Sequence, residues 1–342
     1  MKRIIGLTYD LKSDYTFRDG DPEDAAAELD KPQTVDLIAE SLKAFGYEVL
    51  RIGNFKNLLS SLDRINVDIV FNICEGFYGR NRESQVPMLL ESANIPYVGA
   101  DALTLGLALD KVLAKKAFIA DGILTPKYFT LKDKNELDNF SDLEFPLIVK
   151  PRSEGSSKGL SQKSKVNNYQ ELKERIDYVA KFYPDGVLIE EFIKGAEFTV
   201  AVIGNKPNEK TYNVQTKIDG KLNLGEIFYT FGHVTSDRIE YLYPSPISKD
   251  LEKIIEDAAI RAYRAVDCRD FGRVDIRVDE KNRAYVLEIN PLPSLSIEDV
   301  FPLIAKGLGL EYKDLINQIL NAALSRYNLN LEKRRESVVS TK

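Results

Sequence analysis

The sequence predicts a mixed α/β protein, in part α+β, built from three successive units. Near the N-terminus, short apolar runs alternate with stretches of helical periodicity, which indicates a parallel sheet. Near the middle, an apolar strand ends in a loop rich in Gly and Ser. Near the C-terminus, two apolar runs separated by turn residues predict an antiparallel hairpin.

The composition is that of an ordinary globular protein. The 342 residues carry a net charge of −6, which argues against nucleic acid as the partner because phosphate backbones are bound by basic surfaces. Two cysteines, Cys74 and Cys268, are too few for a disulfide framework, so we expect a cytoplasmic protein. The N-terminus shows neither a signal peptide nor a membrane span, so no membrane partner is expected.

The first unit, residues 1–95, is expected to hold the parallel sheet. Apolar, β-branched runs at 4–8, 47–52 and 67–73 predict its strands. The acidic segment 10–32 leaves the first strand at the edge where α/β sheets bind ligands, so we interpret it as a lid or substrate loop. The two commonest nucleotide fingerprints, GxGxxG after the first strand and GxxxxGK[ST], do not occur, so another phosphate cradle is needed.

The second unit, residues 96–185, carries a candidate phosphate loop in FPLIVKPRSEGSSKG, which ends at Gly159. A predicted strand over 146–150 ends in Lys150, and the following loop can turn several backbone N–H groups toward one point. The loop residues that favour this are Gly155, Ser156, Ser157 and Gly159. Lys111, opening a helix predicted over 110–120, is a second candidate phosphate ligand. The alternatives are a merely flexible turn and a solvated lysine. A further helix is predicted around 169–182.

The third unit, residues 186–327, is mostly strands, with helices expected over 249–266 and near 302–324. Its first part, VLIEEFIKGAEFTVAV, places Glu190 and Glu191 before a turn and Glu197 after it. A strand edge can bind an adenine ring through backbone groups, and carboxylates can accept hydrogen bonds from its amino group or from ribose hydroxyls. Taken alone, the segment is also an ordinary hairpin. Residues 328–342 are expected to be a polar tail.

The predicted hairpin in FGRVDIRVDEKNRAYVLEINPLPSLS is the most informative segment. It places Asp275 on one strand, and it places Glu288 and Asn290 on one face of the next. Carboxylate and amide oxygens are hard ligands that suit Mg²⁺ and, through it, nucleotide phosphates. The alternative is that these are solvated strand residues.

The order and spacing of these motifs resemble the ATP-grasp superfamily and, within it, the D-alanine-D-alanine ligases. The resemblance runs over residues 67–308, and its sharpest matches are VKPRSEGSSKG, EEFIKGAEFTVAV, and RVDIRV followed by LEINPLP. It implies an ATP-grasp fold with ATP held between the second and third units, and two Mg²⁺ ions. It also implies amino-acid or peptide substrates, a homodimer and a place in peptidoglycan biosynthesis.

The resemblance also implies a role for each matching residue. Glu190 and the backbone at Ile193 would contact adenine, Glu191 lies beside them, and Glu197 would bind ribose. Lys111 and Lys150 would hold the α and β phosphates, and the loop from Glu154 to Gly159 would close over the β and γ phosphates. Asp275, Glu288 and Asn290 would bind Mg²⁺. Arg273 would steady the transferred phosphoryl group, and N–H groups near Ser294 would stabilise an oxyanion, although the family more often has Gly there.

The sequence departs from the family at the substrate end. A Lys-Tyr pair that orders the substrate aligns with Val234 and Thr235, beside His233, which is either a partial replacement or incidental. Asp299 aligns with the residue that recognises the carboxylate of the second D-alanine. The negatively charged side chain of Asp299 would repel that substrate carboxylate rather than bind it. A family His-Gly appears as Glu75 and Gly76, and Glu28 is the best counterpart of a glutamate that holds the first substrate's amine. Arg80, Arg82 and Glu83 add charges there.

The expected function is therefore an ATP-dependent carboxylate-amine ligase that works through an acyl phosphate and whose acceptor is not simply D-alanine. Two alternatives stay open at this point. One is a nucleotide-binding regulatory protein, although pure binding would not require Arg273 together with the three metal ligands. The other is a carboxylate-activating enzyme with a thiol or phosphate acceptor.

Overall fold

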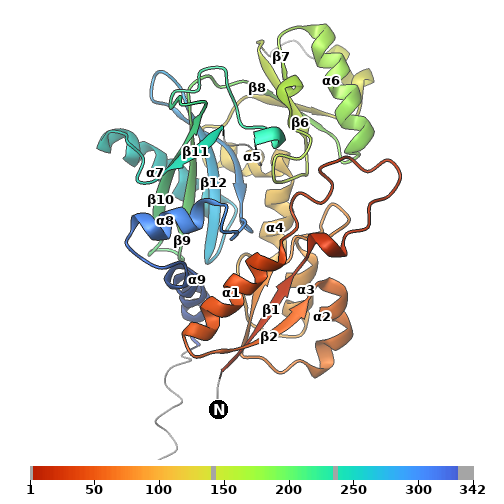
Figure 1. Ribbon diagram of the computed structural model, residues 1–342. Helices are drawn as coiled ribbons and strands as arrows, with labels where there is room; N and C mark the ends of the chain where they lie inside the picture. The colour runs from red at the N-terminus through yellow and green to blue at the C-terminus, as the bar shows by residue number, and fades with distance from the viewer. Residues whose placement is uncertain (1–2, 140–143, 234–237, 330–342) are drawn as a thin grey trace, which may run out of the picture.

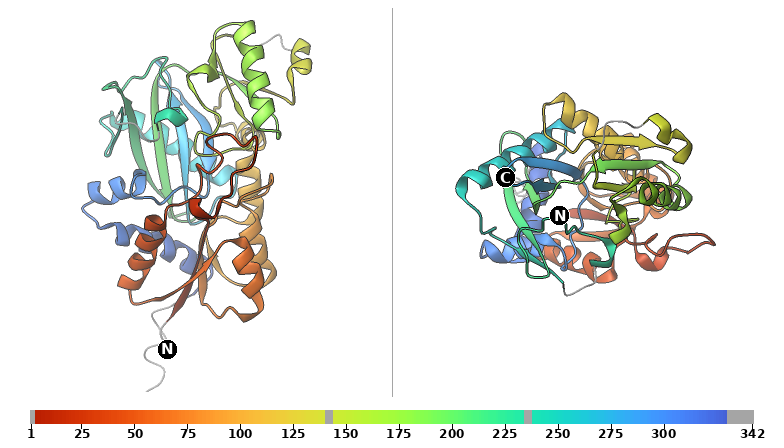
Figure 2. Two further views of the ribbon diagram at one scale, coloured as in Figure 1. Left: turned by 45° about the vertical axis from the view of Figure 1, so that its right-hand side comes forward. Right: turned by 90° about the horizontal axis from the view of Figure 1, so that it is seen from above.

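The computed structural model describes residues 3–139, 144–233 and 238–329, and it contains three sheets (Figure 1). The first has the strand order β2-β1-β3-β4, the second β5-β8-β6-β7 and the third β11-β10-β9-β12-β13. Figure 2 shows the second and third sheets side by side, with the first sheet below them in its left-hand view. None of the helices in this part of the chain has the length and apolar character needed to span a membrane.

The first sheet is parallel, as the alternation of apolar runs and helical stretches predicts. Its strands are β1 (Ile4–Tyr9), β2 (Glu48–Gly53), β3 (Ile69–Ile73) and β4 (Tyr97–Val98). The helices of this region are α1 (Pro32–Ala44), α2 (Phe55–Ser61) and α3 (Gln85–Ser92). Because β1 and β3 are parallel neighbours, the segments that follow them, from Asp10 and from Cys74, leave the sheet at the same edge.

The central region begins with two consecutive helices, α4 (Ala102–Leu109) and α5 (Lys111–Ala120), and continues into the second sheet. Asp110 caps α5 by accepting hydrogen bonds from the N–H groups of Val112 and Leu113. The sheet contains β5 (Tyr128–Leu131), β6 (Leu147–Pro151), β7 (Lys165–Val166) and β8 (Val187–Glu191), and α6 (Tyr169–Phe182) packs against it. The predicted strand and helices of this region are confirmed to within one residue at each end.

The third sheet is antiparallel and contains the predicted hairpin. Its strands are β9 (Ala196–Ile203), β10 (Lys210–Ile218), β11 (Ile239–Leu242), β12 (Phe271–Val278) and β13 (Ala284–Asn290). Its helices are α7 (Lys249–Ala265), α8 (Val300–Gly307) and α9 (Tyr312–Arg326). The last helix returns to lie beside α1 (Figure 1), and one hydrophobic core contains residues of the first and third sheets together.

Two strands bear on the predicted unit boundaries. Strand β4 lies just after residue 95 yet pairs with β3, and β8 lies just after residue 185 yet pairs with β5 and β6. Sheet membership therefore changes a few residues later than the sequence indicated, and the division into units stays a prediction. The predicted polar tail lies outside the described residues after Leu329.

Candidate active site

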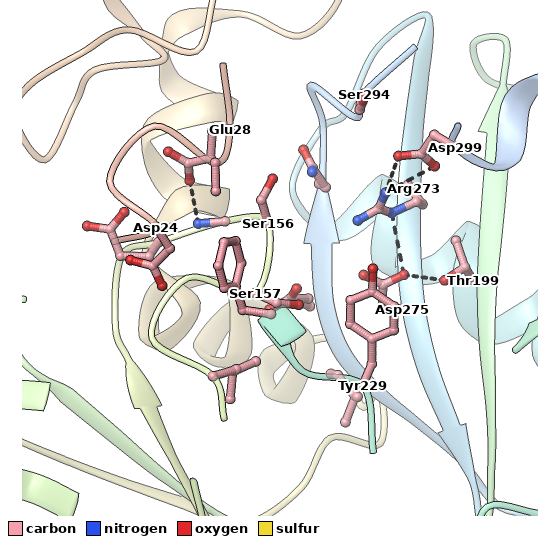
Figure 3. A pocket seen from close by; sticks show the side chains of 18 of the residues that line it. Asp24, Glu28, Ser156, Ser157, Thr199, Tyr229, Arg273, Asp275, Ser294 and Asp299 are labelled. Carbon is pink, nitrogen blue, oxygen red and sulfur yellow. Dashed lines mark hydrogen bonds and ion pairs between the residues drawn. The ribbon is translucent and has the colours of Figure 1, made fainter. Parts of the chain in front are cut away.

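A cavity of about 730 Å³ lies where the three regions meet. Three elements line it: the segment 10–31 after β1, which we call the strap, the Gly/Ser loop 153–160 after β6, and the hairpin of β12 and β13. Figure 3 shows the strap and the Gly/Ser loop on one side and the hairpin residues Arg273 and Asp275 on the other. The candidate residues of the sequence analysis are thus brought together by segments far apart in the chain.

The hairpin places the candidate metal ligands in register. Asp275 pairs with Glu288 across the two strands, and Arg273 pairs with Asn290. Asp275 accepts a hydrogen bond of 2.8 Å from the hydroxyl of Thr199 on β9. Burial raises the pKa of Asp275, Arg273 opposes the rise and Glu288 adds to it, so a cation between the two carboxylates would be favoured.

The donor chemistry fits Mg²⁺. Asp275, Glu288 and Asn290 all line the cavity and offer hard oxygen ligands, which Mg²⁺ prefers. Among the described residues, no cluster of three or more His, Cys, Asp or Glu side chains is arranged to hold a metal ion. Two carboxylates and an amide would therefore need phosphate oxygens to complete a coordination shell, as expected of a nucleotide-linked metal.

Lysines surround this end of the cavity. Lys150 lies 2.8 Å from Glu190 and 4.0 Å from Glu288, and Lys111 lies 3.4 Å from Glu288. Burial alone would raise the pKa of Glu288, but Lys111 and Lys150 outweigh it and lower that pKa to about 2. The two predicted phosphate lysines thus lie beside the predicted metal ligand, neither of them as a solvated lysine.

A third lysine, Lys115, was missed by the sequence analysis. It is fully buried and lies 2.5 Å from Glu190, whose side chain is only 1% exposed. Burial would raise the pKa of Glu190, but Lys115 and Lys150 together keep it below its usual value. Glu190 therefore anchors Lys150 in the structure, and its predicted contact with adenine stays a prediction. The signal that could have identified Lys115 is its place one helical turn after Lys111 on the same helix.

The remaining candidate nucleotide contacts line the same end. Glu191 and Ile193 border the cavity at the end of β8 and just after it, and Glu197 borders it at the start of β9. Glu197 forms an ion pair of 3.4 Å with Arg277 of β12, while Glu191 pairs with Lys127 at 3.5 Å. The segment thus brings backbone groups and two carboxylates to the cavity wall, as the nucleotide-binding interpretation requires.

The Gly/Ser loop adopts positive φ angles, but two of them fall on serines rather than on the glycines that the sequence analysis expected to supply them. Ser156 and Ser157 have positive φ angles of 47° and 57°, and Gly159 has 71°. The Lys158 N–H donates to the Gly155 carbonyl oxygen at 2.9 Å, so residues 155–158 form a tight turn, a conformation that can present N–H groups to an anion. Lys111 donates a hydrogen bond to the carbonyl oxygen of Glu154, which ties the loop to the start of α5.

The strap holds two amides of this loop. The Gly155 N–H donates to Glu28 at 2.6 Å, and the Gly159 N–H donates to Asp24 at 2.7 Å. Asp24 also accepts from the hydroxyl of Tyr183 at 2.7 Å. In this arrangement the strap carboxylates occupy two donors that the sequence analysis expected to face phosphate, which leaves the Ser156 and Ser157 end of the loop toward the cavity (Figure 3).

Beneath the loop, four charged side chains form a network that is nearly excluded from solvent. Arg82 lies 2.8 Å from Glu28 and 3.2 Å from Glu154, and Lys158 lies 3.3 Å and 2.5 Å from the same two carboxylates. Burial would raise the pKa of Glu28, but Arg82 and Lys158 lower it to about 2. Two cations thus balance two anions, and Glu28 is engaged with the Gly/Ser loop rather than left for a substrate amine alone.

The candidate residues of the substrate end lie around Arg273. Arg273 lies 3.3 Å from Asp299 and 3.5 Å from Asp275 (Figure 3). Ser294 lines the cavity, and its hydroxyl accepts a hydrogen bond from the Ser296 N–H. His233 ends the short 3-10 turn η5 (Phe231–His233), and the positions aligned with the Lys-Tyr pair, Val234 and Thr235, lie outside the described residues.

Comparison with known proteins identifies the family. Residues 118–321, more than half of the chain, match the family model described as the D-ala D-ala ligase C-terminus. A D-alanine-D-alanine ligase of a Marinomonas species is 32% identical over 314 residues, covering 87% of this chain and 92% of that protein. The chain belongs to the D-alanine-D-alanine ligase family.

Two further proteins are similar to this chain. An uncharacterized protein of Sinorhizobium fredii, y4sG, is 33% identical over 300 residues, covering 85% of this chain and 88% of that protein. The crystal structure of the D-alanine-D-alanine ligase from Bacillus anthracis superposes with a TM-score of 0.74 at 24% identity, covering 96% of this chain and 99% of that one. The predictions of the ATP-grasp fold, of the family and of its ATP-dependent carbon-nitrogen ligase class are confirmed.

The matched segment of the D-alanine-D-alanine ligase family contains only part of this cavity. It includes Lys150, the Gly/Ser loop and the hairpin, but it begins after Lys111, Lys115 and the strap. Asp24 and Lys158, which the sequence analysis also missed, join the strap to the Gly/Ser loop. No pattern in the sequence marks such a contact, because its partners lie more than 100 residues apart.

Proposed function

We propose that this ligase binds ATP and Mg²⁺ in the cavity, phosphorylates a carboxylate, and joins the resulting acyl group to an amine that is not simply that of D-alanine. The observation that carries the proposal is the hairpin, which lines one cavity wall with Arg273, Asp275, Glu288 and Asn290 opposite the Gly/Ser loop. These groups supply the charge that phosphoryl transfer needs.

The nucleotide would lie between the second and third sheets. Lys111 and Lys150 are in place to bind phosphate oxygens, because each is buried and borders the cavity beside Glu288. The N–H groups around Ser156 and Ser157 would cover the outer phosphates. Glu197 would bind the ribose, with the backbone near Ile193 against the adenine.

Asp275, Glu288 and Asn290 would hold Mg²⁺, which supplies charge neutralisation at the phosphates. In the described state, Lys111 and Lys150 lie beside Glu288 and Arg273 lies beside Asp275. The lysines keep Glu288 ionised, and Arg273 favours the ionised form of Asp275 against the effect of burial, so the ligand set suits a metal that arrives with the nucleotide.

The reaction proceeds in two balanced steps. A carboxylate oxygen of the first substrate attacks the γ phosphorus, the bond to the β-γ bridging oxygen breaks, and ADP leaves. The neutral amine of the second substrate then attacks the acyl carbon, the intermediate loses a proton, and inorganic phosphate leaves as the amide forms. Arg273 is placed to stabilise the phosphoryl group and the oxyanion, with N–H groups near Ser294 on the same side.

The acceptor preference rests on Asp299. Its carboxylate lies against Arg273 and borders the cavity, so it would repel the free carboxylate of an amino-acid acceptor at that position. A simple D-alanine acceptor would bring such a carboxylate. The place in peptidoglycan biosynthesis that the resemblance implies is thus an expectation about the family rather than about this chain's own substrates.

A cytoplasmic location and a homodimer complete the proposal, the first supported by the cysteine content and the second by the resemblance alone.

A regulatory nucleotide-binding protein is the second candidate function. The ion pair between Arg273 and the candidate metal ligand Asp275 argues against a purely regulatory function, because nucleotide binding alone would not require that pair.

Phosphate release from ATP and Mg²⁺, measured across D- and L-amino acids and dipeptides with products identified by mass spectrometry, tests the proposal. We expect amino-acid-dependent release with an amide product. A normal rate of D-alanyl-D-alanine synthesis from D-alanine alone would contradict the proposed acceptor. No phosphate release with any member of the panel, together with tight ATP binding, would favour the regulatory function.

A further inference from the structure

Within the described part of the chain, the carboxyl side chains of Glu75 and Glu83 at the substrate end form no ion pair with a cation. Glu75 follows β3 and Glu83 precedes α3, and both line the cavity. Glu83 is only 6% exposed. Among the described residues, neither side chain forms a hydrogen bond or an ion pair. Burial without a paired cation favours the protonated form of such a carboxyl, and a cation bound beside it would favour the ionised form, so the arrangement suits a cationic ligand.

Glu75 lies at the edge of the parallel sheet where α/β proteins bind ligands. Glu75 leaves the parallel sheet at the same edge as Asp10, whose carboxylate accepts a 2.7 Å hydrogen bond from the Gly76 N–H. Open α/β sheets bind ligands at the carboxyl edge of their strands. Asp30 of the strap lines the same cavity and adds a further carboxyl to its wall.

The neighbouring cations are already used. Arg82 and Lys158 are shared by Glu28 and Glu154, Lys111 pairs with Glu288, and Arg273 lies between Asp275 and Asp299. Burial, reinforced by repulsion from Glu83, raises the pKa of Glu75 well above its usual range, and burial raises that of Glu83 to about 7. Arg82 opposes both rises and Lys111 opposes the second, but neither cation offsets the burial. A bound cation would relieve both effects.

We propose that Glu75 and Glu83 form a subsite for a positively charged side group of one substrate, so that this ligase takes a basic amino acid or a peptide that contains one. The inference rests on the proposed function and names the substrate class of the same site. The group is an alkylammonium or guanidinium beyond the α-amino group that D-alanine itself carries. Two carboxyls offer few of the oxygen ligands that a metal ion needs, whereas they can accept hydrogen bonds from one cationic side group.

Direct binding tests the subsite without requiring turnover. The purified protein, saturated with a non-hydrolysable ATP analogue and Mg²⁺, is titrated calorimetrically with D- and L-lysine, ornithine and arginine, and with norleucine and norvaline as neutral analogues of similar length. We expect at least one basic amino acid to bind at least about tenfold more tightly than its neutral analogue. Equal affinities, or no binding by any basic amino acid while the nucleotide analogue binds, would overturn the inference.

Variants locate the effect. Glu83→Gln and Glu75→Gln keep the side-chain shape and remove the charge, so each is expected to reduce the preference for the basic ligand about tenfold or more, with nucleotide affinity unchanged. Glu40→Gln, an exposed carboxylate on α1, removes the same charge away from the cavity and should leave the preference as it is. An unchanged preference in both cavity variants would reject the subsite. Amino-acid-dependent phosphate release, measured separately, shows whether the ligase proposal fails on its own.

Discussion

Arg273 lies between two carboxylates, with its Nη1 3.3 Å from Oδ2 of Asp299 and its Nε 3.5 Å from Oδ1 of Asp275 (Figure 3). One guanidinium thus links a candidate metal ligand on β12 to the N-cap residue of α8. In the proposed function, a change at Asp299 would therefore act on the group that stabilises the transferred phosphoryl. Acceptor selection and phosphoryl transfer would then share a residue.

Replacing Asp299 by Asn removes the charge but keeps the cap, because Asn is as good an N-cap residue as Asp. We expect acceptors with a free carboxylate to bind better, with KM for D-alanine falling at least about fivefold because a like-charge contact is lost. Thermal unfolding should change little. Steady-state kinetics check this, with Asp250→Asn, exposed in the first turn of α7, as the control. A KM for D-alanine that stays the same would show that Asp299 does not select the acceptor.

Replacing Arg273 by Ala should lower kcat by about a hundredfold or more while nucleotide affinity changes less, because the guanidinium acts on charge that develops during transfer. Pre-steady-state phosphate release and nucleotide titration separate the two effects. Arg283→Ala, on the same hairpin but with an exposed side chain, is the matched control. Equal losses in rate and affinity would mean that Arg273 only binds ATP.

Replacing Glu288 by Gln should abolish Mg²⁺-dependent turnover with the fold retained, because one of two anionic ligands is lost from a cavity wall. Mg²⁺ titration of phosphate release measures it, and circular dichroism checks the fold. Glu280→Gln, in the exposed turn of the same hairpin, should behave as the unmodified chain. An unchanged rate and Mg²⁺ dependence in Glu288→Gln would refute the metal assignment.

Replacing Lys115 by Met should lower the free energy of unfolding by about 3 kcal/mol, because it removes one of two cations that balance the buried Glu190. Urea denaturation measures the loss. Lys116→Met, the exposed neighbour on α5, should change stability by less than about 0.5 kcal/mol. Equal stability of the two variants would show that the buried pair contributes no net stability.

Glu83 predicts a pH dependence of stability. Its pKa is about 7 in the folded protein against an ordinary value of 4.5, so between these values the folded chain keeps a proton that the unfolded chain has lost. Stability due to this group is therefore present below pH 4.5 and is lost as pH rises through 7. The charged groups that act on the pKa of Glu83 are Arg82, Glu28, Lys111 and Glu154. Glu83 in turn raises the pKa of Glu75, so the two carboxyls repel each other when both are ionised.

Glu83→Gln removes this group's contribution. The variant should melt a few degrees above the unmodified chain at about pH 8, and the difference should shrink toward about pH 5. Differential scanning calorimetry of the ligand-free protein across that range measures it, with Glu40→Gln as the control. A difference in melting temperature that is the same at both ends of the range would contradict the shifted pKa.

Local patterns determined much of the fold and part of the site. The helix over 169–182 and the hairpin of β12 and β13 follow from periodicity and turn residues that act within a few positions of the chain. The same hairpin brings Asp275 and Glu288 together on adjacent strands, which the order of turn and apolar residues predicts without any contact from elsewhere in the chain.

Only the tertiary structure decided the partners of the charged side chains. Nothing near Lys115 in the sequence indicates burial against Glu190, and nothing near Glu28 indicates the Gly155 N–H, because those contacts join segments that are far apart in the chain. The sequence marks Glu75 and Glu83 as charged, but their lack of a cation among the described residues appears only when the strap, α3 and the third sheet have packed around one cavity. Periodicity reports the face on which a residue lies, whereas charge balance depends on everything that surrounds it.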